Sequence, residues 1–122
     1  MLVEEELTYR IRGCVYEVSR RLGAGFLEKV YERALLREFE LQGLKAKAQV
    51  PLKVSYKDRV VGEYFVDILV EDKVLIELKA QEKILPMHEA QLLNYLRMSD
   101  RRRVGLLVNF TYPKATIKRL TV

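Results

Sequence analysis

The fold of this chain can be predicted from two neighbouring apolar runs, YFVDILV at residues 64–70 and VLIELKA at residues 74–80. β-Branched, aromatic and aliphatic residues on both sides of a short charged break predict two strands joined by a tight turn. The runs also contain Asp67, Glu77 and Lys79, of which the last two share one face of their strand. Charged side chains are seldom buried unless they pair with one another or with a metal. These three residues are therefore the strongest functional signal in the sequence.

The length of the turn decides whether the two carboxylates meet. A three-residue loop at residues 71–73 would pair Val70 with Val74 and set Asp67 directly opposite Glu77. A two-residue loop would turn Asp67 to the other face, so we predict an odd-numbered loop of three or five residues. Two adjacent carboxylates repel each other unless a cation or a shared proton lies between them. A hard divalent ion with oxygen ligands, Mg²⁺ or Mn²⁺, is the expected occupant.

The composition is that of an ordinary globular protein. The chain has 122 residues, 49% hydrophobic and 32% charged, which we expect to form a single domain over residues 1–122. Its one cysteine, Cys14, rules out an intramolecular disulfide and is expected in the core of a cytoplasmic protein. We identify neither a signal peptide nor an apolar run long enough to span a membrane. The net charge of +5 weakly favours an anionic partner.

Periodicity in the rest of the chain predicts the element order ααβββαβ. Two amphipathic helices are separated by a break that contains Gly23 and Gly25. A strand with clean alternation follows, and Pro51 within it indicates an edge strand or a bulge. A helix that leads from one buried strand into another suggests a crossover with parallel pairing. The predicted helices are residues 4–22, 27–42 and 86–98, and the predicted strands are residues 45–56, 60–70, 74–80 and 104–108, with a final basic edge strand or tail at residues 116–122.

Three motifs in order give the chain a family resemblance. GFLEKVY at residues 25–31 is a literal G-x-x-E-x-x-Y, ELK at residues 77–79 is an E-x-K that follows Asp67, and QLLNY at residues 91–95 is a Q-x-x-x-Y. E-x-K alone has little specificity, since EDK in the predicted turn matches it too. Together the motifs resemble the GxxExxY family of the PD-(D/E)XK nuclease superfamily, and the resemblance extends over about residues 5–122.

The resemblance implies a restriction-endonuclease-like α/β core, with a mixed central sheet flanked by helices, and a divalent metal site. Asp67 and Glu77 would hold one or two Mg²⁺ or Mn²⁺ ions, with the backbone carbonyl of Leu78 as a further ligand. Glu28 would complete or orient the metal shell from its helix. From its spacing alone, however, Glu28 is typical of a solvated glutamate in a first helical turn.

The remaining residues of the implied site follow on the strand and on the next helix. Lys79 would position the attacking water or stabilise charge on the phosphate. Gln91 and Tyr95 would brace the site or touch the scissile strand, although their spacing equally fits a pair on the flank of a helix. His88, on the same helix, is typical of a surface or capping residue.

Three classes of function follow from these residues. The leading hypothesis is a Mg²⁺-dependent hydrolase that cleaves DNA phosphodiester bonds, structure-specifically or nonspecifically, because the predicted elements leave no room for a separate recognition domain. A homodimer or a partner protein stays open, and no membrane contact is expected. The alternatives are a catalytically silent module on the same fold that binds nucleic acid or protein, and a structural protein in which Glu77 and Lys79 form an ion pair.

Overall fold

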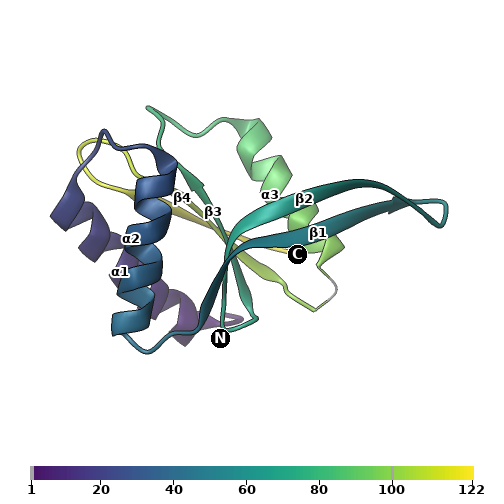
Figure 1. The fold of residues 1–122 in the computed structure, drawn as a ribbon, viewed down its shortest axis with the longest axis horizontal. Coiled ribbons are helices and arrows are strands. Elements are labelled where there is room, and N and C mark those ends of the chain that lie inside the picture. Colours follow the sequence, from purple (N-terminus) through teal and green to yellow (C-terminus); the bar gives the residue numbers. More distant parts are fainter. Residues whose placement is uncertain (1, 100) are drawn as a thin grey trace.

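The chain forms three helices and five strands within the residues that the structure, a computed structural model, describes, which are 2–99 and 101–122 (Figure 1). The predicted α/β class and order are confirmed, and the C-terminal segment forms a strand. In chain order the elements are α1 (Glu5–Leu22), α2 (Glu28–Leu41), β1 (Ala46–Tyr56), β2 (Arg59–Val70), β3 (Val74–Lys79), α3 (Pro86–Met98), β4 (Val104–Asn109) and β5 (Thr116–Thr121).

The strands form one mixed sheet in the order β1-β2-β3-β4-β5. β3 and β4 are parallel, and the other neighbours are antiparallel. α3 makes the crossover between the two parallel strands, as expected from a helix set between two apolar runs. β3 and β4 are buried along almost their whole length, which explains why they are apolar on both faces.

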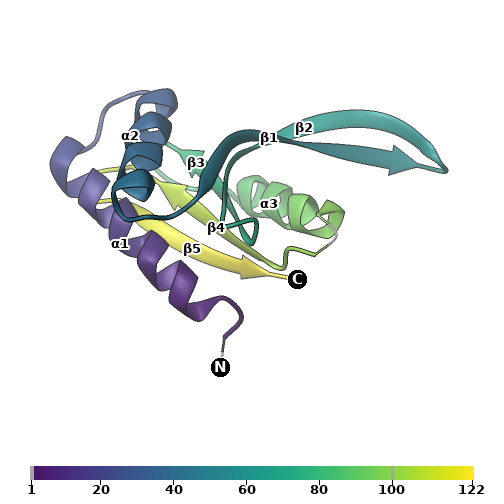
Figure 2. The ribbon, with the colours of Figure 1, turned by 60° about the horizontal axis from the view of Figure 1, so that its bottom comes forward.

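Helices cover both faces of the sheet, and the alternation of strand residues sorts the core into two layers (Figure 2). On one face, α1 and α2 pack against residues such as Ile68, Ile76 and Leu106. On the other, α3 packs against the intervening residues, including Leu75 and Leu107. The helices therefore hold the central strands from both faces. Asp67 and Glu77 lie on two of these strands, β2 and β3.

The predicted register between β2 and β3 is confirmed. Residues 71–73 form a three-residue turn, and Val70 pairs with Val74. Counting outward along the two strands, Asp67 lies opposite Glu77. The last pair of the ladder is one step before these two residues, so β2 and β3 separate at the carboxylates.

Both acidic residues of this turn, Glu71 and Asp72, make contacts that stabilise the fold. Asp72 accepts hydrogen bonds from the guanidinium groups of Arg101, at 2.8 Å, and Arg102. The Arg102 bond, together with the charges of both arginines, holds the pKa of Asp72 below its ordinary value. Glu71 accepts the N–H of Lys45 at 2.5 Å. The E-x-K match in the turn therefore serves the fold.

Beyond the point where β2 leaves β3, β1 and β2 continue as a two-stranded ribbon, which we call the arm (residues 50–66). Figure 1 shows it as a long curved hairpin that extends past α3 and away from α1 and α2. Val50 pairs with Val66 at its base, and Tyr56 pairs with Arg59 at its tip. The arm exposes apolar side chains of β2 to solvent. An isolated hairpin is marginally stable in water, so the base of this arm depends on its contacts with the sheet and α3.

Three smaller predictions, on Cys14, His88 and Pro51, are confirmed. Cys14 is buried and unpaired, and burial raises the pKa of its thiol to about 11. His88 is a capping residue, since its Nδ1 accepts the N–H of Leu85 at the start of α3. Pro51 lies in the edge strand β1, whose register shifts nearby at Val54/Ser55. Within the described residues, no helix is both long and apolar enough to cross a membrane.

Two glycine-to-alanine substitutions should have opposite effects on stability. A Cβ on Gly13, exposed on α1, would meet open space, so Gly13→Ala should raise the free energy of unfolding by about 1 kcal/mol. A Cβ on Gly105 would lie 3.0 Å from the fully buried Leu92, so Gly105→Ala should lower it by roughly 1–3 kcal/mol. Urea unfolding measures both changes. If Gly105→Ala left the midpoint unchanged or raised it, the tight packing of α3 on β4 would be contradicted; a lower midpoint for Gly13→Ala would contradict the prediction for α1 alone.

Candidate active site

Asp67 and Glu77 lie in the fork where β2 and β3 separate. Each carboxylate accepts a backbone N–H from the opposite strand in place of a ladder hydrogen bond. The N–H of Leu78 donates to Asp67 Oδ2 at 2.7 Å, and the N–H of Asp67 donates to Glu77 Oε1 at 3.1 Å. These two bonds replace backbone pairing at a buried position, where unpaired N–H groups would be costly. The geometry therefore requires the two carboxylates to lie side by side.

Burial and mutual repulsion make both carboxyl groups hold protons more tightly. Only 6% of Glu77 is exposed, and burial, followed by the charge of Asp67, raises its pKa to about 8. A hydrogen bond between the two carboxyl side chains acts in the same direction. Burial also raises the pKa of Asp67, and the charge of Glu32 adds to this effect. The pair therefore concentrates negative charge that either a shared proton or a cation can stabilise.

A third acidic residue, Glu32 of α2, belongs to this cluster, and the sequence analysis did not select it. Glu32 is buried, and its Oε1 accepts a hydrogen bond from Gln49 Nε2 at 2.7 Å. The same amide nitrogen lies 3.4 Å from Asp67 Oδ1, so Gln49 bridges the two carboxylates. Lys29 pairs with the other oxygen of Glu32 at 2.8 Å. Gln49 adopts a left-handed φ of 54°, which is uncommon for a residue with a side chain.

Glu28, the acidic residue predicted from the G-x-x-E-x-x-Y motif, does not lie in the cluster. It is the first residue of α2 and is exposed, as is Leu27 before it. Among residues 2–99 and 101–122, no hydrogen bond or ion pair joins Glu28 to the carboxylates. The sequence does contain a signal for Glu32, which lies three residues before the buried Leu35 and thus places a charge on the apolar stripe of the helix.

Lys79 and Leu78 enter the site from the end of β3. Lys79 is half-buried. Its positive charge partly offsets the effects that raise the pKa values of Asp67 and Glu77. The ion pairs of the described residues do not include a Glu77–Lys79 contact, which speaks against a purely structural role for these two residues. Leu78 contacts Asp67 through its N–H. Its carbonyl as a metal ligand stays a prediction.

α3 brings Tyr95 to the carboxylates and Gln91 to the groove beside them. Tyr95 is 5% exposed, and burial raises its pKa to about 12, with further contributions from the charges of Glu77, Tyr64 and Asp67. Its hydroxyl is therefore protonated at neutral pH and available as a hydrogen-bond donor. Gln91 lies one turn earlier on the same helix and lines a groove with Tyr95 and Tyr64. The structure thus gathers the predicted residues Asp67, Glu77, Lys79, Gln91 and Tyr95 around one end of β3.

The sequence of the whole site region also matches a known family. A family model of the PD-(D/E)XK nuclease superfamily matches residues 5–120. The chain belongs to this superfamily. The crystal structure of SSO0001 resembles it with a TM-score of 0.60 and 21% identity, over 97% of this chain and 59% of that one. This likeness concerns the fold, and the chain spans less than two thirds of that protein. None of the curated proteins matches the sequence.

The superfamily's metal chemistry can be tested against the donor atoms present here. Among the described residues, no group of three or more His, Cys, Asp or Glu side chains is arranged to hold a metal ion. Asp67 and Glu77 are therefore the main anionic ligands that the protein could offer to a metal ion. Mg²⁺ is commonly held by one or two carboxylates, with waters and substrate phosphates as its other ligands. Two adjacent carboxylates, each oriented by a backbone N–H, supply oxygen donors of the kind that such an ion takes.

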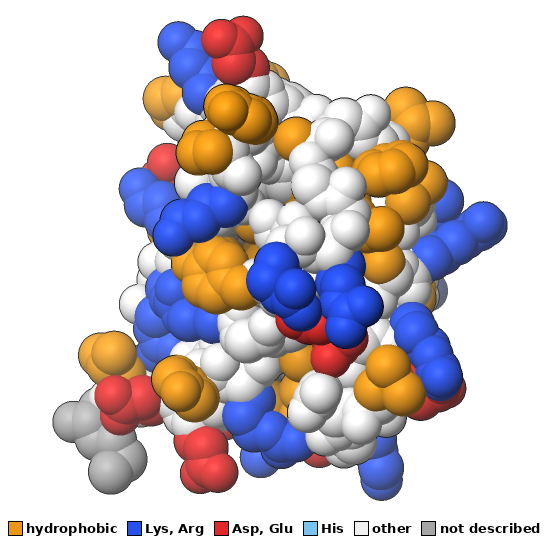
Figure 3. Space-filling model, turned by 90° about the vertical axis from the view of Figure 1, so that its left-hand side faces the viewer, with side chains coloured by type: hydrophobic (Ala, Val, Ile, Leu, Met, Phe, Trp, Pro, Cys, Tyr) orange, Lys and Arg blue, Asp and Glu red, His pale blue; other side chains and the backbone are white. Residues whose placement is uncertain are grey.

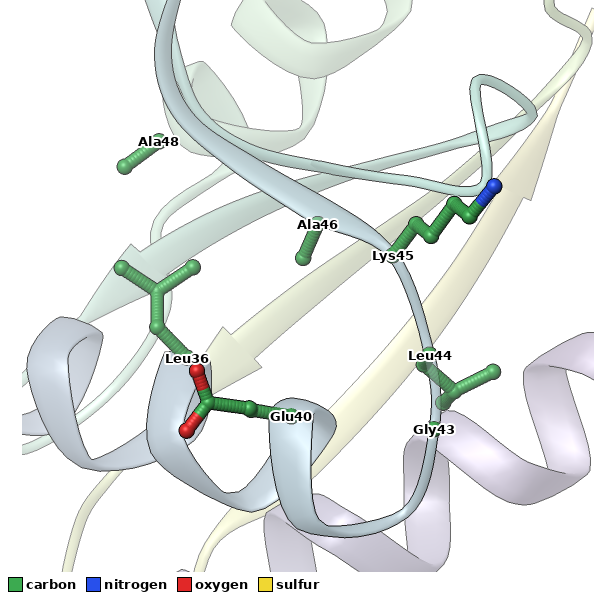
Figure 4. A pocket seen from close by; sticks show the side chains of 7 residues that line it. All are labelled: Leu36, Glu40, Gly43, Leu44, Lys45, Ala46 and Ala48. Carbon is green, nitrogen blue, oxygen red and sulfur yellow. The ribbon is translucent and has the colours of Figure 1, made fainter.

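A second hollow of about 500 Å³ lies between the end of α2 and the start of β1 (Figure 4). Aliphatic side chains, including Leu36 and Ala46, line it together with Glu40 and Lys45. None of these residues belongs to the carboxylate cluster or to its hydrogen bonds. This hollow therefore lacks the paired carboxylates that are found in the fork between β2 and β3.

The raised pKa of Glu77 predicts a specific dependence of stability on pH. Between about pH 4.5 and pH 8 the folded protein holds a proton that the unfolded chain has released, so stability falls as pH rises through this window. Glu77→Gln keeps the acceptor oxygen and should remove most of this fall, which is on the order of a few kcal/mol. Thermal melts in EDTA from about pH 5 to about pH 8.5 measure the effect. Glu28→Gln, at an exposed position, is the control and should retain the wild-type slope; parallel slopes for both variants would contradict the assignment.

Proposed function

We propose that the protein is a metal-dependent nuclease that hydrolyses phosphodiester bonds of DNA, and that it belongs to the GxxExxY family within its superfamily. The observation that carries this proposal is the pair of Asp67, which is partly buried, and Glu77, which is buried, held side by side by backbone N–H groups in the fork of the sheet. A chain that served only as a scaffold would gain nothing from two adjacent carboxylates that are partly or wholly removed from solvent, because their desolvation and repulsion destabilise the fold.

Asp67 and Glu77 would hold Mg²⁺ or Mn²⁺. When bound, such an ion lowers the pKa of a coordinated water and stabilises negative charge on a phosphate. The hydrogen bonds from Leu78 and Asp67 N–H groups fix the carboxylate orientations before any ion or substrate arrives. Pre-organised ligands of this kind lower the reorganisation that binding and chemistry require.

The other residues act on the substrate and on the carboxylates. Lys79 would orient the attacking water or stabilise charge that develops on the scissile phosphate. Tyr95, protonated at neutral pH, would donate a hydrogen bond to a phosphate oxygen. Glu32 acts through Gln49 on Asp67 and is therefore a positioning residue rather than a ligand of the substrate. Gln91 would contact the strand beside the site.

The surface charge supports a nucleic-acid substrate without indicating sequence recognition. A net charge of +5 provides general attraction to phosphates. On the face seen in Figure 3, Lys and Arg side chains are interspersed with acidic and apolar ones. Such an arrangement favours structure-specific or nonspecific cleavage, and a second copy or a partner protein would extend the contact with DNA.

A cleavage assay tests the proposal directly. Wild type should cut labelled single-stranded, double-stranded or branched DNA in Mg²⁺ or Mn²⁺ and should not cut it in EDTA. Asp67→Asn and Lys79→Ala should each lower the rate by about 100-fold or more, because each removes a charge from the reacting centre. Circular dichroism checks that both variants fold. If wild type bound DNA but cut none of these substrates with either ion, the protein would be a binding module on a nuclease fold.

A matched pair of variants tests which glutamate of α2 serves the site. Glu32→Gln should lower the cleavage rate about 10–100-fold, as expected when a group that orients a metal ligand is altered. Glu28→Gln, one helical turn away on the exposed end of the helix, should leave the rate unchanged. The rise in melting temperature on adding Mn²⁺ gives a second measurement, and it should shrink in Glu32→Gln alone. The opposite ranking would show that Glu28 reaches the metal in the working enzyme.

A further inference from the structure

A groove beside the carboxylates runs between α3 and the arm. It has a volume of about 510 Å³, within the range of roughly 300–1,000 Å³ typical of small-ligand sites. Tyr64 and Val54 of the arm form one wall, and Gln91, Asn94 and Tyr95 of α3 form the other. No motif predicted this groove, because its walls come from two segments that are far apart in the sequence.

The groove offers an aromatic surface. The rings of Tyr64 and Tyr95 pack at a centroid distance of 5.7 Å and an angle of 44°. Tyr95 is buried beneath, whereas 48% of Tyr64 is exposed. Met87 and Met98 also line the groove, and their flexible thioethers pack well against flat rings. A half-exposed ring with such neighbours is suited to stacking against a flat heterocycle, as in proteins that bind single-stranded nucleic acids.

Polar groups on the α3 wall complement the edges of a base. Gln91 and Asn94 carry amides, each with both donors and an acceptor. Arg97, one turn after Asn94 on the same helix, donates from its Nη1 to Asn94 Oδ1 at 3.2 Å. This bond leaves the amide nitrogen of Asn94 as a donor, and the guanidinium provides positive charge for a nearby phosphate.

Tyr95 connects the groove with the carboxylate cluster. Tyr95 belongs to both, since it lines the groove and the charges on Glu77 and Asp67 act on its hydroxyl. Tyr64 is three residues before Asp67 on β2. A nucleotide whose base lies in the groove would therefore place its phosphate toward the carboxylates.

We propose that this groove binds an unpaired nucleobase of the substrate strand, so that the enzyme acts on single-stranded or locally unpaired DNA. The inference rests on the proposed nuclease function and specifies its substrate class. A base within a duplex is stacked on both sides and paired along its edge, and it could not enter a groove bounded by α3 and the arm. An unpaired base can stack on Tyr64 and present its edge to the amides.

The experiment compares two neighbouring aromatic residues on opposite faces of β2. Tyr64 and Phe65 are 48% and 49% exposed, but only Tyr64 lines the groove. Fluorescence anisotropy in EDTA measures the affinity for a short labelled single strand and for the corresponding duplex. Tyr64→Ala should weaken single-strand binding roughly tenfold and leave duplex binding unchanged. Tyr64→Phe, which keeps the ring, and Phe65→Ala should both bind like wild type.

The proposal that the groove binds a base is overturned if the Tyr64→Ala variant binds the single strand as wild type does. It is also overturned if Phe65→Ala weakens single-strand binding as much as Tyr64→Ala. Cleavage of the same oligonucleotides in Mn²⁺ separates this failure from failure of the nuclease proposal. If Tyr64→Ala cuts and binds normally while Asp67→Asn does not cut, the groove is wrong and the nuclease stands. If Tyr64→Ala loses single-strand binding but wild type never cuts, base binding stands and hydrolysis is wrong.

Discussion

The separation of β2 from β3 at Asp67 and Glu77 explains most of what is particular to this fold. Two carboxylates there take the hydrogen bonds that the backbone would otherwise make across the ladder. Without acceptors, the N–H groups of Leu78 and Asp67 would be unpaired at a buried position, which costs free energy. The same exchange brings the acidic side chains together and frees β2 to continue into the arm. One local departure from sheet pairing thus creates both the charge cluster and the groove wall.

The surrounding elements hold this fork in place. The central strands are packed by α1 and α2 on one face and by α3 on the other, so the fork cannot relax by moving either strand. The parallel pairing of β3 with β4 continues through Lys79, opposite Asn109. Asn109 in turn exchanges hydrogen bonds with the backbone of Gln81. These contacts fix the end of β3 from which Lys79 and Glu77 reach the site.

The site lowers the stability of the fold and provides a prepared arrangement of charges. Burial and repulsion raise the pKa values of Asp67 and Glu77, which means that their charged forms are disfavoured in the folded protein. Gln49 adds a left-handed backbone conformation where its side chain bridges Glu32 and Asp67. Backbone conformations of this kind persist where the surrounding structure over-determines them, often at functional sites. These features occur within one connected cluster, which is why we propose it as the active site.

Patterns in the sequence were enough to predict the element order, an odd-numbered turn of three or five residues and the juxtaposition of Asp67 with Glu77. These features depend on the period of two along a strand and on the loop that joins neighbours, which are local properties. The choice of Glu32 over Glu28 as the partner of the carboxylates came from the packed structure, because the two glutamates are one turn apart on the same helix and differ in their burial and in the contact of Glu32 with Gln49. The groove lined by Tyr64 of the arm and Tyr95 of α3 was likewise visible only in the packed structure. Contacts between distant segments depend on packing angles and strand curvature, which no short-range pattern specifies.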